Sequence, residues 1–233
     1  KESSSIKAVA EVTVTQAEPY EEYLVAAYDD VASIVYFGEI LKGYWTKFYS
    51  SVREAIEASV KEYYLLKEKC ALLDERMKKL EEQLLEEEYA FLCAVAYRQS
   101  IAAHKLVCDG EGNLLFFSKE CDSNGCIGTV DISYPSSPLF FLFDTEYVKA
   151  MLRPVFKFSH MPVWGYEFAP HDVGRYPYAN GQVYGVKEEF GYSEPHNGKV
   201  FPAYYMYPAG SDIYKESMQM PLEECGNMLI LCA

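Results

Sequence analysis

Five acidic residues offer the clearest chemistry in this sequence. Glu120, Asp131, Asp172, Glu223 and Glu224 all stand in turn-rich stretches or at the start of a predicted helix. Hydrolysis of an amide or a glycosidic bond needs one group that activates water or attacks, and another that protonates the leaving group. Paired carboxylates can divide this work when their environments push their pKa values apart. We therefore take these five acids as candidate catalytic residues of a hydrolase.

Two details limit how these acids can be used. Glu223 and Glu224 are neighbours near a helix start, so they cannot both point the same way and at most one should face a pocket. Interaction with the helix dipole is the alternative role for the other, or for both. His171 stands beside Asp172 and could act as a general base or a metal ligand, or simply as a hydrogen-bonded structural group.

Signatures of several enzyme classes are absent. The sequence holds no GxSxG, HExxH or GxxxxGK[ST] motif, so serine hydrolases, zincins and nucleotide hydrolases have no motif support. No CxxC pair occurs among the seven cysteines, and we therefore expect no metal site and no cofactor. Mostly buried free thiols are the expected state, with a disulfide between Cys121 and Cys126 as the alternative in an oxidising compartment.

Composition narrows the possible partners. Half of the residues are hydrophobic, which predicts a folded chain, and 21 Lys and Arg against 35 Asp and Glu give a net charge of −14. This balance argues against nucleic acid or an anionic membrane as a partner. No apolar run approaches the ~18 residues of a membrane span. We expect a soluble protein with a small-molecule substrate. The sequence does not indicate its cellular compartment.

The elements that must position these residues fall into two predicted parts. Strands are expected at residues 6–16, 22–27 and 33–37, and so few strands look like the tail of a β-domain over residues 1–43. The remainder, residues 44–233, is predicted to be mainly helical.

The first predicted helix carries an apolar stripe from Ile56 to Leu84 at alternating spacings of three and four. Read alone, this stripe could be a coiled coil. A break is expected near Glu86 to Glu88, because one helix of more than 60 residues is improbable. Further along, the sequence predicts a buried helix over 89–107, a strand over 114–117, a loop over 118–138, a helix over 145–158 that Pro154 kinks or interrupts, loops over 162–219, and a last helix from 221.

Several separated blocks resemble one known family. They are LFFSKE, NGCIGTVDISYPSSPLFFLF, MLRPVFKF, FAPHDVGRYPYANGQVYG and MPLEECGNMLILCA. Together they resemble the central region of the glutaminase A family of bacteria and fungi, over about residues 30–233. The resemblance implies a β-sandwich, here represented by its tail over 1–43, followed by the first part of an (α/α) six-hairpin toroid over 44–233. The toroid would have long antiparallel helices and loop-rich insertions, and would pack against the remaining domains of a longer enzyme.

The resemblance also implies hydrolysis of L-glutamine to L-glutamate and ammonia. In that reaction Asp131 and Asp172 would be acid and base, and Glu223 or Glu224 would hold the substrate's amino group. Arginine suits the substrate's carboxylate, because its planar fork matches that group. The candidate substrate-binding residues are Arg153, Arg175, His171, Tyr178 and Asn180.

Fold alone does not fix the substrate. A glycoside hydrolase that uses two of the same carboxylates is the second hypothesis, and a non-catalytic helical interaction module is the third. Two features depart from the family pattern: Cys225 stands where serine is expected, and the stretch 186–219 is longer than typical.

Overall fold

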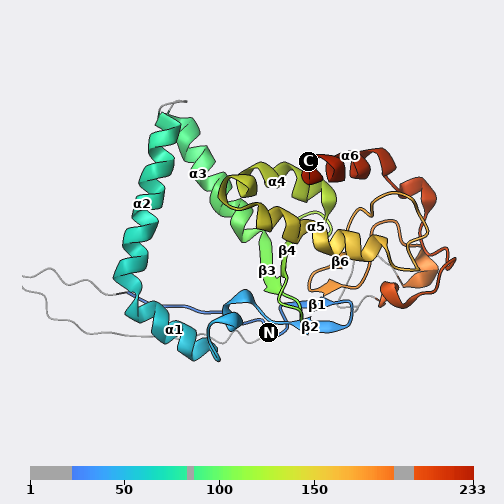
Figure 1. Cartoon of the computed structure of the whole chain (residues 1–233), viewed down its shortest axis with the longest axis horizontal. Coiled ribbons are helices and arrows are strands. Elements are labelled where there is room, and N and C mark those ends of the chain that lie inside the picture. Colours follow the sequence, from blue (N-terminus) through green and yellow to red (C-terminus); the bar gives the residue numbers. More distant parts are fainter. Residues whose placement is uncertain (1–22, 83–86, 192–201) are drawn as a thin grey trace, which may run out of the picture.

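The computed structural model describes residues 23–82, 87–191 and 202–233, which are mainly helical, as the sequence predicted (Figure 1). Helices α4, α5 and α6 lie together beside the strands, whereas α1, α2 and α3 form an arm that projects from this body (Figure 1). The six α-helices of the described part are α1 (Val52–Lys61), α2 (Tyr63–Glu82), α3 (Glu87–Ala102), α4 (Val130–Phe143), α5 (Thr145–Ser159) and α6 (Pro221–Cys232). Four short 3₁₀ helices cover Tyr44–Lys47, Glu188–Phe190, Tyr204–Met206 and Glu216–Met218.

The strands form two small sheets. A five-stranded sheet has the order β2-β1-β7-β6-β5, and β3 pairs with β4 in an antiparallel hairpin. β1 pairs in parallel with β7, so that Val35 lies opposite Tyr178 although they are far apart in the sequence. The strands are β1 (Ile34–Tyr36), β2 (Glu39–Leu41), β3 (His104–Cys108), β4 (Leu114–Ser118), β5 (Cys126–Ile127), β6 (Gly174–Arg175) and β7 (Tyr178–Ala179).

The N-terminal strand predictions have mixed outcomes. The strand expected over 33–37 is confirmed as β1, while the one expected over 6–16 lies outside the described residues. The strand expected over 22–27 is wrong within its described part, because residues 23–27 have no regular structure. The domain boundary at residue 43 stays a prediction, although β1 and β2 share a sheet with strands from the second half of the chain.

Helix α5 packs against β4 in the centre of the body. Asp144 caps its start by accepting a hydrogen bond from the Glu146 N–H at 2.9 Å. Val148, Met151 and Val155 recur at helical spacing, are buried, and belong to the core. Pro154 lies inside this helix, which runs on to residue 159, so the proline does not end it.

Helix α4 was not predicted, because Pro135 and Pro138 fall within it. A proline cannot donate to the carbonyl four residues earlier. The Ser137 hydroxyl compensates in part, since it donates at 2.8 Å to the Tyr134 carbonyl, the one that Pro138 leaves without its helical donor. The residues expected to be a loop over 118–138 therefore continue into a helix whose buried residues include Val130 and Phe140.

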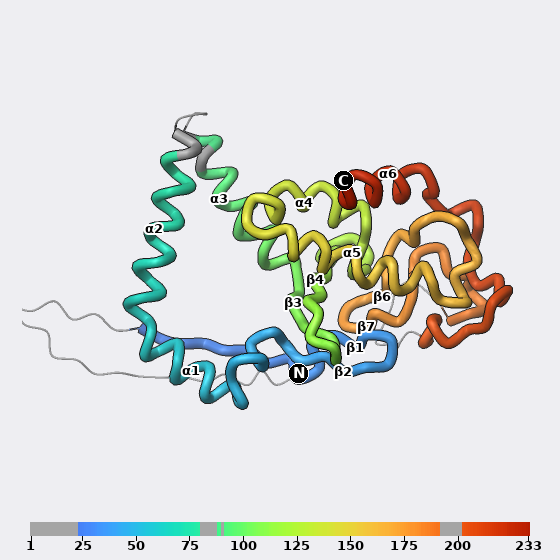
Figure 2. Tube along the Cα trace, in the orientation of Figure 1, coloured from blue at the N-terminus to red at the C-terminus, as the bar shows by residue number. Residues whose placement is uncertain are grey.

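The projecting arm, whose path Figure 2 traces, differs from its prediction in three ways. The first predicted helix is divided at Glu62 into α1 and α2. The break expected near Glu86 to Glu88 lies partly outside the described residues, since α2 ends at Glu82 and α3 begins at Glu87. The third helix stops at Ala102 and the chain continues as β3, so the helix predicted over 89–107 is wrong at its end. It is also not buried, because the side chains of Phe91 and Leu92 are 70% and 61% exposed.

None of the described helices is both long and apolar enough to cross a membrane.

Candidate active site

Two helix starts bring acidic side chains together. Asp131 lies in the first turn of α4 and Glu224 in the first turn of α6, and these helices pack against each other. The loop that carries His171 contacts the start of α4, because the Val130 N–H donates to the His171 carbonyl at 2.9 Å. Acids at these positions interact favourably with the positive ends of the helix dipoles.

Asp172 holds this loop in shape. Its carboxylate is fully buried and accepts hydrogen bonds from the backbone N–H groups of Gly174 and Val183, each at 2.9 Å, and of Tyr184 at 3.1 Å. Gly174 is needed here, because its φ is +147° and a Cβ atom would lie 2.0 Å from the Tyr178 carbonyl oxygen. Asp172 is therefore a loop-organising carboxylate as well as a neighbour of the site.

His171 is held between two carboxylates. Its Nδ1 lies 3.0 Å from Asp172 Oδ2, its Nε2 lies 3.8 Å from Asp131 Oδ2, and its ring stacks on Tyr184 with centroids 4.3 Å apart. Burial by itself lowers the pKa of His171, but the hydrogen bond and charge of Asp172, with the charges of Asp131 and Glu224, raise it to about 9.

Glu224 and Asp131 keep carboxylate oxygens without partners. Both oxygens of Glu224 and Oδ1 of Asp131 are buried and accept no hydrogen bond from the described residues. Burial raises the pKa of Glu224 to about 8, against the lowering effect of His171. The pKa of Asp131 is also raised, by burial first, although His171 opposes this and 30% of the Asp131 side chain stays exposed.

A third acid and a thiol border the same cluster. Glu120 follows β4, and its buried Oε1 has no hydrogen-bond partner among the described residues, while Oε2 accepts from the Ser123 hydroxyl. Cys126 in β5 is 2% exposed, and burial raises the pKa of its thiol well above the usual range. One ligand atom each of Glu120, Cys126 and His171 lies within 4.8 Å of the others, so these residues could hold a metal ion.

Other predicted residues lie in different settings. The Glu223 side chain is exposed, although its charge acts on Asp131 and Glu224. Arg153 is engaged elsewhere, since its guanidinium donates to the Leu114 carbonyl at 2.8 Å and to Glu146 at 3.0 Å.

The remaining predicted residues lie on β6, on β7 and directly after β7. Arg175 lies opposite Cys126 in the β5–β6 pairing and opposite Tyr178 in the β6–β7 pairing. Asn180 is buried, and its Oδ1 has no hydrogen-bond partner in the described part of the chain. The structure thus brings Arg175 next to the cluster's thiol. It leaves Tyr178 and Asn180 on the strand and turn that follow.

Reasoning from the sequence missed two residues of this cluster. Cys126 was read only as a thiol and disulfide candidate, and the structure leaves both Cys121 and Cys126 as free thiols. Gln182 is fully buried, accepts from the His171 N–H at 2.7 Å, and donates to Gln219 at 2.9 Å. Its position shortly after the His171-Asp172 pair was the available signal, but an uncharged amide gave no chemical reason to select it.

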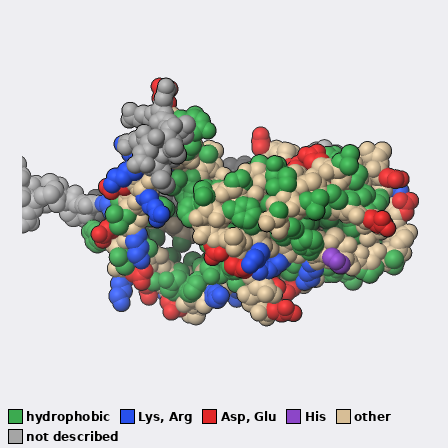
Figure 3. Space-filling model, turned by 45° about the horizontal axis from the view of Figure 1, so that its top comes forward, with side chains coloured by type: hydrophobic (Ala, Val, Ile, Leu, Met, Phe, Trp, Pro, Cys, Tyr) green, Lys and Arg blue, Asp and Glu red, His purple; other side chains and the backbone are tan. Residues whose placement is uncertain are grey.

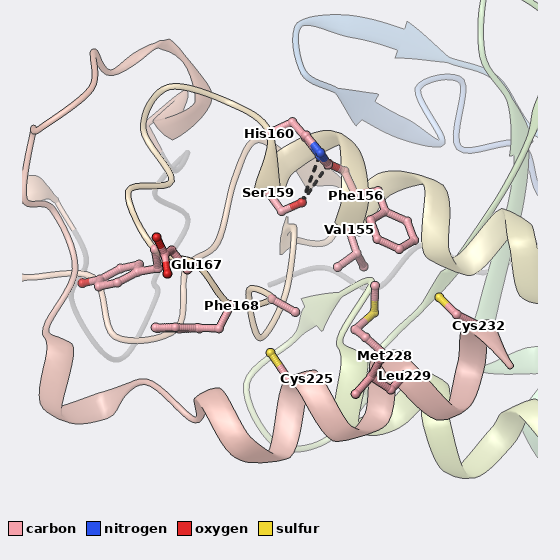
Figure 4. A pocket seen from close by; sticks show the side chains of 12 residues that line it. Val155, Phe156, Ser159, His160, Glu167, Phe168, Cys225, Met228, Leu229 and Cys232 are labelled. Atoms are coloured by element: carbon pink, nitrogen blue, oxygen red, sulfur yellow. Dashed lines mark hydrogen bonds between the residues drawn. The ribbon is translucent and has the colours of Figure 1, made fainter.

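A separate groove lies between α5 and α6. It has a volume of about 440 Å³, and Figure 4 shows Val155 and Phe156 of α5 and Met228 of α6 on its walls. Cys225 and Cys232 also line it. None of the five predicted acids is among its lining residues, so this groove is distinct from the acidic cluster that Glu120, Asp131, Asp172 and Glu224 form.

Comparisons with known proteins point to one family. The model of the glutaminase A six helical-hairpin domain matches residues 86–233. Glutaminase A of Aspergillus oryzae is 28% identical over 193 residues, which cover 82% of this chain and 24% of that protein. A probable glutaminase of Arthroderma benhamiae is 29% identical over 145 residues, which cover 62% of this chain and 13% of that protein. No solved structure matches at a significant level.

The chain therefore spans a quarter or less of the length of these curated relatives. The family model nevertheless covers α3 to α6 and every residue of the acidic cluster. By that match, the chain belongs to the glutaminase A family and contains sequence of its six helical-hairpin domain.

Proposed function

We propose that this protein is a hydrolase of the glutaminase type, which converts L-glutamine and water to L-glutamate and ammonia. The observation that carries the proposal is the meeting of Asp131 and Glu224 beside His171, with carboxylate oxygens that no described residue satisfies. Two relatives that bear the name glutaminase support the same reaction class.

Asp131 and Glu224 lie in different environments, so one can act as the base and the other as the acid. Asp131 is 30% exposed and can reach water, so we assign it to activating the attacking water. Glu224 is fully buried, and burial favours the protonated carboxyl, so we assign it to protonating the leaving ammonia.

Asp172 was predicted to be one of this acid/base pair, and we now give it a different role. Four groups already occupy its carboxylate: three backbone N–H groups and His171. Because these contacts engage its lone pairs, we assign Asp172 to positioning His171 and the loop. Its assignment as a positioning residue is part of the proposal.

A cysteine nucleophile is the main alternative within amide hydrolysis, and Cys126 is the candidate, because its sulfur lies within 4.8 Å of a His171 ring nitrogen. The nucleophile must be a thiolate, which an electropositive, partly exposed environment favours. Cys126 is 2% exposed and surrounded by Asp172 and Glu120, whose charges raise the pKa of its thiol further. These surroundings favour the carboxylate mechanism.

Arg175 is the better of the two predicted anchors for a substrate carboxylate. It lies opposite Cys126 at the edge of the cluster, whereas Arg153 lies on α5 beside Glu146. Asn180, with an unpartnered buried Oδ1, is a second candidate contact. These assignments extend the proposal to substrate binding.

Ammonia release from L-glutamine by the full-length protein tests the proposal. Asp131→Asn and Glu224→Gln should each lower kcat at least 100-fold, the lower end of what a positioned acid or base contributes. Glu188→Gln, an exposed residue of a 3₁₀ helix, serves as the control and should have no effect. Ammonia release that survives both substitutions would refute the assigned roles. Hydrolysis of aryl glycosides without ammonia release would favour the glycosidase alternative.

A further inference from the structure

The acidic cluster contains more carboxyl groups than there are basic side chains beside it to neutralise their charge. Glu120, Asp131, Asp172 and Glu224 converge from four segments of the chain, and their charges act on His171 or on its neighbours. Burial of an ionised carboxylate without a partner is costly, so such groups hold protons or a cation. Glu224 is fully buried with both oxygens unpartnered in the described structure, so it either holds a proton or faces a positive group.

Three side chains in this cluster form a coherent set of metal donors. A carboxylate oxygen of Glu120, the Cys126 sulfur and a ring nitrogen of His171 lie within 4.8 Å of one another. Cys126 and His171 are 2% and 5% exposed. Sulfur, imidazole nitrogen and carboxylate oxygen are the three ligand types that zinc accepts, and catalytic zinc sites use three protein ligands and keep one position for water.

Backbone hydrogen bonds fix these donors relative to one another. The Glu120 N–H donates to the Cys126 carbonyl at 2.9 Å, and the Val173 N–H donates to the Ile127 carbonyl at 3.0 Å. The segments that carry all three donors are thus joined by main-chain contacts, not by flexible side chains. A site built this way is organised before a ligand binds.

The neighbour of His171 also fits metal binding. Asp172 lies against Nδ1 at 3.0 Å, which leaves Nε2 as the ring nitrogen without a hydrogen bond from the described residues. Histidine ligands of metals usually donate their other ring N–H to a carboxylate, which fixes the ring and its tautomer. Asp172 is itself held by three backbone N–H groups, so it can fix His171 firmly.

We propose that Glu120, Cys126 and His171 bind a zinc-type divalent cation, with Asp172 orienting His171. The Cys126 thiol loses its proton to solvent as the sulfur–metal bond forms, and the dication offsets the charge of the surrounding carboxylates. A metal-bound water would be available to Asp131, whose Oδ2 lies 3.8 Å from His171 Nε2. A metal site was not expected from the sequence. The proposed site does not depend on which bond the enzyme cleaves.

Cobalt(II) tests the site without substrate, because it replaces zinc and absorbs light. The full chain, stripped of metal by a chelator and desalted, is titrated with Co²⁺. We expect one equivalent to bind, with a sulfur-to-cobalt charge-transfer band. Cys126→Ser should abolish this band, and Glu120→Gln should weaken Co²⁺ binding at least tenfold, as even second-shell changes typically do.

Matched controls come from the same loop. Cys121→Ser and Asp122→Asn change exposed residues between Glu120 and Cys126, and both should keep the band and the affinity. Near-ultraviolet circular dichroism of each metal-free variant checks folding. Should Cys126→Ser not fold, Glu120→Gln decides, because its position is only partly buried.

Three results would overturn the proposal: no saturable binding of one equivalent, a band that persists in Cys126→Ser, or binding that Glu120→Gln leaves unchanged. A band that disappears in Cys121→Ser would locate the cobalt at a surface thiol and have the same effect. The readout is optical and contains no glutamine. Failure of the metal site therefore leaves the ammonia assay, and the roles of Asp131 and Glu224, to be judged separately.

Discussion

Glu223 and Glu224 are neighbours in the sequence, but their surroundings are opposite. Glu224 is fully buried with no described partner, and Glu223 is exposed on the same first turn of α6. We expect Glu224→Gln to lower kcat for L-glutamine at least tenfold more than Glu223→Gln does. The Glu223 charge acts on the site only from solvent, where it is screened. Equal losses in steady-state ammonia assays would contradict this distinction.

A buried histidine outside the site predicts acid sensitivity. His104 stacks on Phe116, its Nδ1 lies 2.6 Å from the Ser100 carbonyl, and its Nε2 has no described partner. Burial lowers the pKa of His104 to about 4, from the 6.5 expected for the unfolded chain. Below pH 6.5 the unfolded state therefore binds a proton that the folded state refuses.

The folded state is accordingly expected to lose stability as the pH falls from 6.5 toward 4, by up to roughly 3 kcal/mol at full linkage. His104→Phe should flatten this part of the profile of unfolding free energy against pH, measured by urea denaturation. His160→Gln, at an exposed position, is the control and should keep the wild-type slope. An unchanged slope in His104→Phe would refute the assignment.

At the scale of elements, α4 depends on a side chain to repair its backbone. The Ser137 hydroxyl donates to the Tyr134 carbonyl, which Pro138 cannot serve. Ser137→Ala should lower the free energy of unfolding by about 1 kcal/mol, the usual net value of such a hydrogen bond. Ser136→Ala should cost less, because its hydroxyl donates to the Ser133 carbonyl, which has no proline four residues later. Equal effects in urea unfolding would argue against the compensating role.

At the scale of the whole molecule, a broad apolar surface lies over α4 and α6. Leu142 of α4 and Leu222 of α6 are 83% and 91% exposed. Figure 3 shows a face of the molecule on which hydrophobic side chains gather. Exposed apolar patches of this kind mark interaction surfaces. We propose that this face packs against further parts of a longer enzyme, in keeping with the 24% of the Aspergillus relative that the chain spans.

Charged substitutions at these two exposed leucines should change the self-association of the isolated chain and the melting temperature of the full-length protein. Leu142→Glu and Leu222→Glu should reduce self-association of the isolated chain in analytical ultracentrifugation. In the full-length protein the same changes should lower the melting temperature, because they would bury a charge. Phe48→Glu, an exposed apolar position near α1, is the control and should leave the full-length melting temperature unchanged. An unchanged melting temperature of the full-length protein in both leucine variants would exclude this face as an internal interface.

Local pattern sufficed for some elements. Helices α5 and α6 and strand β4 lie close to where the sequence predicts them, because the residue pattern that indicates each one is local. It failed at α4, where prolines obscure a helix that is stabilised by packing and a serine hydroxyl. It also failed after Ala102, where tertiary pairing with β4 makes residues 104–108 a strand.

The sequence by itself determined which chemical groups this protein has, including the acids at 120, 131, 172 and 224, and the blocks that assign it to its family. Only the tertiary structure decided which of these acids share one buried cluster, that Cys126 joins them, and that Arg153 pairs elsewhere. The reason is physical. Electrostatic coupling and desolvation depend on distances and burial in space, and residues from α4, α6 and the β5–β6 region become neighbours only when the chain is folded.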